Sequence, residues 1–264
     1  MALQCPPGFD NQHLRRQVLA TYDRVARDPH GDFHFHRGPR YAVEFLHYDA
    51  DALAELPHTA TARFAGVGNP HRIGPIEAGE TVLDHACGAG MDLLLAARRV
   101  GPDGRAIGVD LTPAMRACAV EAAREAGLDD RVEIRAGEFE SLPVADASVD
   151  VVLSNGVVNL APDKPRVLGE VARVLRPGGR LYLADVVVRR ELTLDARANP
   201  ELWAACIAGA LTEDELYTLV HAAGFDQVYI VERFDCFRGT SAEARVARDL
   251  RVQSVNLFAR RRGH

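Results

Sequence analysis

The sequence has no run of apolar residues approaching the roughly 18 that a membrane-spanning helix needs. Its first residues show no basic segment followed by an apolar stretch, so we expect no secretory signal peptide. Basic residues are not in excess either, because 31 Lys and Arg stand against 37 Asp and Glu, for a net charge of -6. A mildly acidic surface has no general attraction for nucleic acid or anionic lipid. We therefore expect neither nucleic acid nor a membrane as a partner.

Cysteine is scarce and shows no disulfide framework. The number of cysteines is odd and their spacing is irregular, with thiols at Cys5, Cys87, Cys118, Cys206 and Cys236. Free thiols in a reducing compartment are the simplest interpretation of such a pattern. We therefore predict a cytoplasmic protein.

Internal repeats and low-complexity segments are also absent, but three regions differ in character. Residues 1–75 are rich in His, Pro and aromatic residues with few strand-like runs, so we expect an N-terminal cap or substrate lid there. Residues 76–264 are predicted to form the main domain. Within that domain, a Trp-bearing segment at about 188–211 is expected to be an insert on the substrate side.

Residues 76 to about 187 alternate short β-type runs with helical stretches. The predicted strands are Thr81–Cys87, Arg105–Leu111, Arg131–Gly137, Val149–Asn155 and Arg180–Val187. The predicted helices are Met91–Val100, Pro113–Ala126 and Pro165–Leu175. Strands separated by helices pair in parallel through right-handed crossovers. The pattern therefore predicts an α/β fold with a doubly wound, mostly parallel sheet.

One more helix and two more strands are predicted after residue 211. Thr212 and Glu215 match a capping box at the start of the helix, and Gly224 is placed to end it. Gln227–Phe234 and Val252–Arg260 have the composition of strands. Little between them resembles a crossover helix, so we expect these two strands to pair antiparallel.

A glycine-containing loop, running from Asp84 to Gly90, follows the first predicted strand and opens the next helix. Its glycines let the backbone approach a ligand where any side chain would collide. Asp110 ends the second strand, where an acid accepts hydrogen bonds from both ribose hydroxyls of an adenosine. A nucleoside cofactor is therefore predicted at this edge of the sheet. Its expected contacts here are Asp84, Ala86, Gly88, Gly90, Asp110 and Leu111.

Two features of this loop distinguish between adenosine cofactors. A dinucleotide fingerprint has a third glycine at position 93, and this sequence has Leu93. Asp84 would repel a phosphate, but it suits the ammonium group of a methionine moiety, directly or through water. The loop therefore favours S-adenosylmethionine over a nicotinamide dinucleotide, and an oxidoreductase stays as a less favoured alternative.

Two later strands end in motifs that belong to the same edge. Glu138 follows the third strand and is expected to accept the adenine amino group, with Phe139 beside the ring. Asn155 and Gly156 end the fourth strand, where the sulfonium is expected. A solvated turn acid at Glu138 and a strand-end cap at Asn155 are the structural alternatives.

With these motifs, residues 76–262 resemble the class I S-adenosylmethionine-dependent methyltransferases. The resemblance includes Leu175-Arg-Pro-Gly-Gly-Arg180, a turn common in that superfamily. It implies a seven-stranded sheet whose seventh strand is antiparallel. Tyr22, in a predicted helix, resembles the cap tyrosine that covers the cofactor in related enzymes.

Within that superfamily, residues 60–235 are similar to the arsenite methyltransferases. Three motifs carry the similarity: Gly66-Val-Gly-Asn-Pro70, Ser154-Asn-Gly-Val-Val-Asn-Leu160 and Cys206-Ile-Ala-Gly-Ala-Leu211. Arsenite methyltransferases usually have a cysteine in each motif, and the thiolates hold trivalent arsenic. Here Val67 and Gly156 occupy two of these positions, and only Cys206 remains. We therefore expect poor handling of arsenite.

The acceptor side of the site is less defined by the sequence. His34 and His36 lie in an aromatic-rich segment and, at strand-like spacing, would face the same way. Either is a candidate general base for a hydroxyl, thiol or amine acceptor. Cys206 is a candidate substrate contact, although a small core residue is the commoner role for such a cysteine. We expect no metal site, and the sequence does not specify an oligomeric state.

Together these features predict an S-adenosylmethionine-dependent methyltransferase that acts on a small-molecule nucleophile such as a thiol, metalloid, amine or hydroxyl. Two alternatives stay open. One is an arsenite methyltransferase with a reduced cysteine set. The other is a non-catalytic, S-adenosylmethionine-binding regulatory subunit, which the intact cofactor motifs do not exclude.

Overall fold

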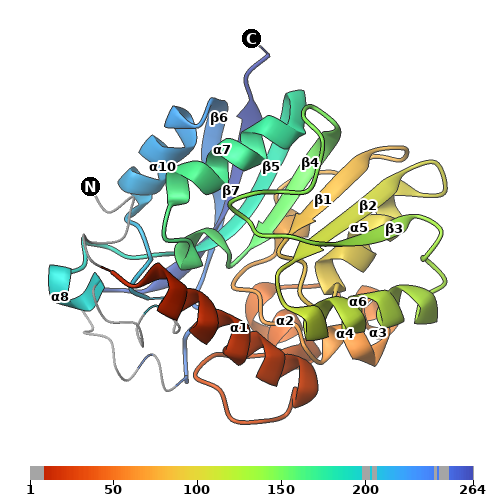
Figure 1. The fold of residues 1–264 in the computed structure, drawn as a ribbon, viewed down its shortest axis with the longest axis horizontal. Helices are drawn as coiled ribbons and strands as arrows, with labels where there is room; N and C mark the ends of the chain where they lie inside the picture. Colours follow the sequence, from red (N-terminus) through yellow and green to blue (C-terminus); the bar gives the residue numbers. More distant parts are fainter. Residues whose placement is uncertain (1–8, 198–202, 204–206, 241–242, 244–249, 264) are drawn as a thin grey trace.

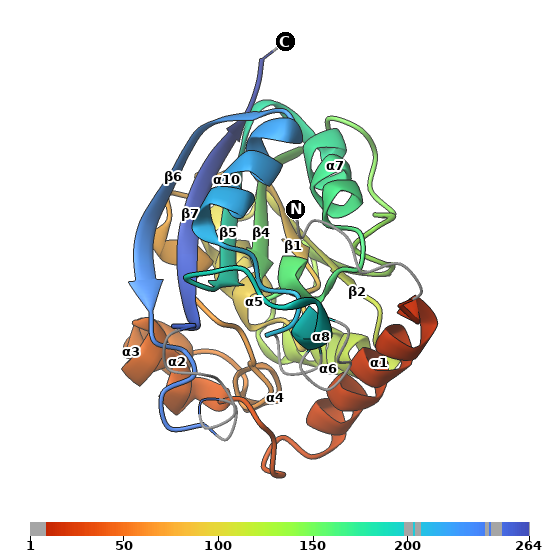
Figure 2. The same cartoon turned by 90° about the vertical axis from the view of Figure 1, so that its left-hand side faces the viewer.

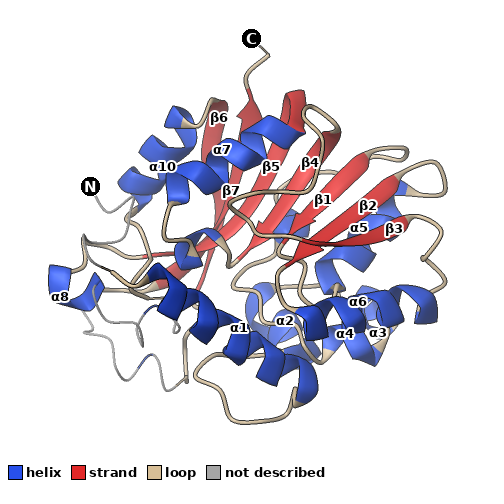
Figure 3. Ribbon diagram, viewed as in Figure 1, coloured by secondary structure: helices blue, strands red, loops and turns tan. Residues whose placement is uncertain are grey.

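The structure is a computed structural model, and it describes residues 9–197, 203, 207–240, 243 and 250–263. Seven strands form one sheet in the order β3-β2-β1-β4-β5-β7-β6 (Figure 1). Helices lie on both sides of the sheet, as the colouring by secondary structure shows (Figure 3). The predicted α/β, doubly wound fold with seven strands is therefore confirmed.

The bounds of the elements follow in chain order. The strands are β1 (Thr81–His85), β2 (Arg105–Asp110), β3 (Val132–Ala136), β4 (Val149–Asn155), β5 (Leu175–Val187), β6 (Phe225–Phe234) and β7 (Gln253–Arg261). The helices are α1 (Asn11–Arg27), α2 (Gly38–Leu46), α3 (Ala50–Ala54), α4 (His58–Thr61), α5 (Met91–Val100), α6 (Pro113–Glu125), α7 (Lys164–Val174), α8 (Leu194–Arg197) and α10 (Glu213–Ala222). In the part of the chain that the structure describes, the short 3-10 helices are η1 (Pro70–Arg72) and η2 (Val158–Leu160).

The sheet reverses its winding between β1 and β4, which are parallel neighbours although two other strands separate them in sequence. From β1 the chain moves outward to β2 and β3, with α5 and α6 packed on one face. From β4 it moves the other way to β5, with α7 and α10 on the opposite face. Ligands of such sheets bind outside the carboxyl ends of the strands at this reversal. Asp84 and Asn155 are therefore placed at the expected ligand position.

The core is buried because both faces of the central strands carry apolar side chains. On one face, Leu83 and Val152 pack with Leu168 of α7. On the other, Val82 and Val151 pack with Ala96 of α5. Strands covered on both faces read as nearly continuous apolar runs, which is why the sequence located them well.

The C-terminal strands confirm the predicted antiparallel closure, because β7 pairs antiparallel with both β5 and β6. The capping box before α10 is also formed, with Thr212 and Glu215 each bonding the backbone of the other. Most boundaries differ from the prediction by one or two residues, and the largest difference is at the start of β5. β5 begins at Leu175 rather than Arg180, because Leu175 already pairs with Val149 before an irregularity in the register.

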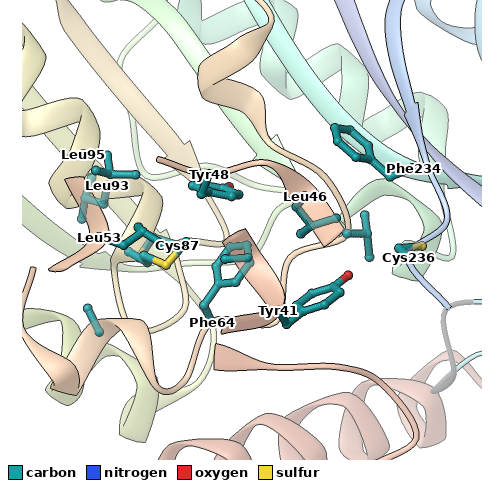
Figure 4. Close-up of a cluster of buried hydrophobic side chains, with 14 of the residues drawn as sticks. Tyr41, Leu46, Tyr48, Leu53, Phe64, Cys87, Leu93, Leu95, Phe234 and Cys236 are labelled. Atoms are coloured by element: carbon teal, nitrogen blue, oxygen red, sulfur yellow. The ribbon is translucent and has the colours of Figure 1, made fainter. Parts of the chain in front are cut away.

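Residues 9–75 form α1 to α4 and η1, which lie at the end of the sheet where the parallel strands terminate (Figures 1 and 2). Their apolar side chains join the core rather than forming a separate one. Tyr41, Tyr48 and Phe64 belong to one buried cluster with Cys87 of the glycine loop and Phe234 of β6 (Figure 4). The N-terminal region is therefore packed as part of the domain and covers the carboxyl ends of the parallel strands.

The aromatic segment at 33–36 and the Trp-bearing segment at about 188–211 differ from the prediction or are described only in part. Residues 33–36 adopt bends between α1 and α2 and not a strand, so strand alternation does not set their directions. The predicted Trp-bearing insert is described only in part, through α8 and the buried Trp203. In the part of the chain that is described, no helix is both long and apolar enough to cross a membrane.

Candidate cofactor and acceptor site

A pocket opens at the reversal point between β1 and β4, and it holds about 930 Å³ of empty space counted out to its mouth. Its walls come from the glycine loop, the ends of β2 and β4, the N-terminal helices and the segment around residue 65. Of the residues predicted to contact the cofactor, those lining it are Tyr22, Asp84, Ala86, Gly88, Asp110, Leu111, Phe139, Asn155 and Gly156.

Asp84 is the buried anion at the centre of this pocket. Its side chain is 3% exposed, and its Oδ2 has no hydrogen-bond partner. Burial raises the pKa of Asp84 well above its usual value, and the nearby carboxylates of Asp92 and Asp110 raise it further. A buried carboxylate without a partner is unfavourable unless a cation or donor meets it. This site is therefore built to receive positive charge.

Asp110 is held rigidly at the end of β2. Its Oδ2 accepts from the backbone N–H of Gly88 at 2.9 Å, and its Oδ1 accepts from the N–H of Thr112 at 2.7 Å. Burial raises the pKa of Asp110, and these two backbone hydrogen bonds oppose that rise. Each carboxylate oxygen keeps a further lone pair, so a diol can still bind to this group.

The glycine loop approaches the pocket through unusual backbone conformations. Gly88 has a φ of +54°, and a Cβ at this position would meet no protein atom within 4 Å. Ala86 also has a positive φ of +64°, which is strained for a residue with a side chain and typical of functional loops. Gly90 caps α5 with a φ of +92° and is not part of the lining. Its contribution is to turn the chain into the helix.

Leu93, which argues against a dinucleotide, is fully buried in α5. The small residue that permits close packing here is Gly108 of β2. A Cβ on Gly108 would lie 2.7 Å from both Cys87 Sγ and Leu93 Cδ2. The strand therefore supplies the space that a dinucleotide site obtains from a third glycine in the helix.

Asn155 holds the acceptor side of the pocket together. Its Oδ1 accepts from the backbone N–H groups of Val67 at 2.8 Å and Gly68 at 3.1 Å. Its Nδ2 lies within hydrogen-bonding distance of the Gly68 carbonyl, Asp92 Oδ2 and the Tyr48 hydroxyl. The amide is thus fully used inside the protein. It fixes residues 66–69, which we call the strap, across the end of β4.

Val67 of the strap lies beside Gly156. A Cβ built on Gly156 would be 3.4 Å from Cγ1 of Val67. The two positions that the arsenite methyltransferase resemblance assigns to thiolates therefore do converge, but here they form a small apolar wall. Cys206, the third position, lies outside the described residues.

Glu138 is placed beside the pocket and not in its lining. Its carboxylate forms a bidentate ion pair with Arg15 of α1, with Nη1 to Oε2 at 2.6 Å. Both residues line a neighbouring hollow that shares Val18, Leu111 and Phe139 with the main pocket. The ion pair closes α1 against the loop after β3. Phe139 contributes to both spaces, and its ring lies edge-on to the buried His85.

The predicted bases are not brought to the pocket. His36 bonds the backbone oxygen of Arg238 through Nε2 at 2.8 Å and packs against Tyr41 and Phe45. His34 lies edge-on to Phe35. Neither histidine is among the residues that line the pocket. Tyr22, in contrast, does line it from α1.

Three residues of this site carried no signal that the sequence interpretation used. Asp92 lies two residues after Gly90, buried within an apolar helix, and it accepts from Tyr48 Oη at 2.7 Å. A carboxylate inside a predicted buried helix was the available signal for it. Tyr48 and Arg63 come from the N-terminal region, whose irregular pattern predicted no position for them.

The residues present fit S-adenosylmethionine, whose methionine end carries a sulfonium and an ammonium. The unpartnered Oδ2 of Asp84 offers an acceptor for positive charge, and the open face of Gly88 leaves room for a nucleoside. Asp110 is placed to accept from a ribose. Among the described residues, no three or more His, Cys, Asp or Glu side chains are grouped to hold a metal ion.

A family model described as a methyltransferase domain matches residues 76–224, which is more than half of the chain. The chain belongs to this methyltransferase family. The matched segment contains the glycine loop, Asp110, Asn155 and Gly156. The prediction of a methyltransferase with S-adenosylmethionine as its cofactor is therefore confirmed at the level of the family.

Individual methyltransferases are similar to this one. An arsenite methyltransferase of Halobacterium salinarum is 47% identical over 190 residues, covering 72% of this chain and 48% of that protein. Nocamycin O-methyltransferase of Saccharothrix syringae is 43% identical over 110 residues, covering 41% of this chain and 39% of that protein. The crystal structure of an arsenic(III) S-adenosylmethionine methyltransferase from Chlamydomonas reinhardtii is 34% identical, with a TM-score of 0.69, covering 80% of this chain and 72% of that one.

The chain spans about half the length of the curated arsenite methyltransferases that it matches. The similarity therefore extends over the methyltransferase core and leaves much of those relatives without a counterpart here. The predicted likeness to arsenite methyltransferases is confirmed. Val67 and Gly156 stand at two of the positions where that resemblance leads us to expect a cysteine.

Proposed function

We propose that this chain transfers a methyl group from S-adenosylmethionine to a small organic nucleophile. The observation that carries the proposal is the buried carboxylate of Asp84 at the reversal point of the sheet, whose Oδ2 has no hydrogen-bond partner. Family membership supports the reaction type, and the geometry supports the cofactor. When bound, the cofactor supplies a methyl group that its sulfonium already activates.

The residues of this chain then mainly bind and orient. Asp84 accepts from the ammonium of the methionine moiety, and Asp110 accepts from the ribose hydroxyls. Ala86 and Gly88 bring the loop backbone close to the nucleoside. The N-terminal helices exclude water, with Val18 and Tyr22 of α1 in the pocket wall. Positioning and water exclusion account for most of the catalysis in such a displacement.

The acceptor wall favours an organic nucleophile with an apolar surface. Phe64, Gly156 and Val157 line it, and Val67 lies next to Gly156. Among the described residues that line this pocket there is no histidine, which argues against His34 and His36 as bases for the acceptor. The pocket therefore suits an acceptor that is already a strong nucleophile, such as a thiolate, a phenolate or an amine.

Arsenite is the second candidate, because several relatives are named arsenite methyltransferases. Trivalent arsenic is held by two or three thiolates together. The convergence of positions 67 and 156 keeps the geometry of such a site, but the residues there carry no sulfur. Arsenite therefore ranks below an organic acceptor.

We further propose that residues 9–75 act as the lid over the cofactor and that the protein works in the cytoplasm. The position of α1 over the pocket supports the lid. The free Cys87, Cys118 and Cys236 support a reducing compartment.

The test is a screen with S-adenosylmethionine labelled on the methyl group against thiols, phenols, amines and arsenite with excess thiol. Label transfer to an organic acceptor, absent in Asp84→Asn, is the expected result. Label on arsenic alone would establish the second candidate. Cofactor binding without turnover on any acceptor would instead support a regulatory subunit. Calorimetry with NADH tests the remaining alternative, an oxidoreductase, which should bind NADH in preference to S-adenosylmethionine.

A further inference from the structure

Within the described residues, Arg63 is the one basic side chain that lines this pocket. The other charged groups of the described lining are the carboxylates of Asp84, Asp92 and Asp110. Arg63 follows α4 at the start of the segment that carries the strap, and its neighbours in the wall, Ala60 and Phe64, are apolar. The side chain is partly buried, so part of its charge is withdrawn from water.

The guanidinium is held in place without being neutralised. Its Nε donates to the backbone oxygen of Ala26 at 2.7 Å, and its Nη1 donates to that of Thr59 at 3.0 Å. Across the part of the chain that the structure describes, Arg63 has no acidic partner within 4 Å, and its Nη2 donates to no protein group. Two neutral carbonyls thus fix the orientation of the planar group and leave its charge available.

Asp84 presents the complementary feature in the same pocket. Its unpartnered Oδ2 takes a cationic or donating group, whereas the free Nη2 edge of Arg63 takes an anionic one. An α-amino acid carries both groups on one carbon. A pocket with one buried acid and one oriented guanidinium therefore matches the zwitterionic end of a methionine moiety, provided that both side chains face the same ligand.

We propose that Arg63 binds the α-carboxylate of the cofactor's methionine moiety, while Asp84 takes its ammonium. The inference rests on the proposed function, since it names a further residue of the same site. It predicts that the affinity for the cofactor depends on the carboxylate, and that this dependence is lost without the guanidinium. An anionic acceptor bound by Arg63 would instead leave cofactor affinity unchanged.

The experiment compares S-adenosylmethionine with decarboxylated S-adenosylmethionine by calorimetry, in the full chain and in Arg63→Met. Met keeps the apolar stem without the charge. The unaltered protein should prefer the carboxylate-bearing compound by about 10- to 100-fold, the range of one charge-assisted hydrogen-bond pair. In Arg63→Met this preference should fall to about threefold or less, because only the compound with the carboxylate loses a partner.

Arg37 provides a matched control. It is also a half-buried arginine that bonds two backbone carbonyls, those of Pro29 and Gly31, but it does not line the pocket. Arg37→Met should therefore keep the full preference. Arg63→Lys, which keeps the charge but not the fork, should retain part of it and serves if Arg63→Met does not fold.

Three outcomes decide the matter. Collapse of the preference in Arg63→Met, with Arg37→Met unchanged, supports the assignment. Equal weakening of both compounds would mean that Arg63 only ties α1 to α4, and unchanged binding of both would move it to the acceptor; either result overturns the assignment. If the unaltered protein bound neither compound nor S-adenosylhomocysteine, the proposed function itself would fail.

Discussion

The two sides of the pocket are built from different materials. The cofactor side consists of strand ends and a glycine loop, and its polar groups are Asp84 and Asp110, both nearly buried. The acceptor side consists of the strap and the residues after β4, and small apolar residues such as Gly156 and Val157 line it. The charged side chains lie where the cofactor is expected, whereas the surface where the acceptor is expected is mainly apolar.

This difference separates what a family shares from what distinguishes its members. A charged contact needs an atom at one place and tolerates little change. An apolar wall can change by a methyl group or a sulfur atom while the fold stays the same. This chain is similar to arsenite methyltransferases but has Val67 and Gly156 at two positions where the resemblance predicts cysteine, which is an instance of that freedom.

The largest expected effect is on the cofactor side, at Asp84. Asp84→Asn removes the buried negative charge but keeps the shape of the side chain. It should weaken S-adenosylmethionine binding by about 3 kcal/mol, because the cofactor's ammonium loses its ionic partner. Calorimetry measures the change, with the exposed Asp103→Asn as a control. Unaltered affinity, with the fold intact by circular dichroism, would remove Asp84 from the cofactor site.

The same residue should make binding depend on pH. Burial and the neighbouring carboxylates raise the pKa of Asp84 above its usual value in the empty pocket. A cationic cofactor binds the ionised form, so affinity should rise as the pH increases through this raised pKa. Binding should release protons, measured by calorimetry in buffers of different ionisation enthalpy. Proton release that persists in Asp84→Asn would assign it to another group.

A smaller loss is expected at the ribose contact. Asp110→Ala should weaken cofactor binding by about 1–3 kcal/mol, because two hydroxyls lose a charged acceptor. Part of the effect will be indirect, since Asp110 also holds the N–H groups of Gly88 and Thr112. Asp110→Asn keeps one acceptor oxygen, so its affinity for the cofactor should lie between those of the unaltered protein and Asp110→Ala. No change in affinity would show that the ribose binds elsewhere.

On the acceptor side, the informative experiment introduces arsenic-binding cysteines. Val67→Cys with Gly156→Cys places two sulfur atoms where the structure brings these positions together. The double variant should bind trivalent arsenic more tightly than either single variant, about tenfold or more for a second thiolate. Titration with phenylarsine oxide checks this. Rapid methylarsenic formation by the unaltered protein, lost in Cys206→Ser, would instead show that the present wall already serves arsenite.

The smallest effect should come from breaking the ion pair between Arg15 of α1 and Glu138. Arg15→Gln breaks the ion pair to Glu138, in which both side chains are more than one-third exposed. Exposed pairs contribute about 0–1 kcal/mol, so stability should barely change. Cofactor dissociation in a stopped-flow experiment should quicken by a small factor, and salt should reduce the difference. A large loss of stability would show that α1 is a structural element and not a cover.

The cofactor side was predictable from sequence because its groups sit at strand ends. Once β1 and β2 are recognised as parallel, Asp84 and Asp110 must lie at the same edge. The partners of Asn155 were not predictable, because they come from the strap, 87 and 88 residues earlier in the chain. Arg15 and Glu138 are 123 residues apart in the sequence, and a local sequence pattern does not predict an ion pair over such a separation.

The failures on the acceptor side have the same origin. His34 and His36 drew attention as an alternating motif, but the segment bends instead of forming a strand, and contacts with Phe35, Tyr41 and Phe45 occupy the rings. Arg63 and Tyr48 lie in a region of short helices whose packing depends on the whole domain. Periodicity carries little information there, since the helices are too short to show a face.

The strap has a consequence for how the protein is made. Ser254 and Asn256 of β7 bond the strap at Val67 and Asn69, so its position depends on a strand that follows nearly 190 residues later. During synthesis β7 emerges after β6 and must enter the sheet between β5 and β6. Until β7 has entered the sheet, its hydrogen bonds to the strap cannot form, so the acceptor wall is completed only after this strand is in place.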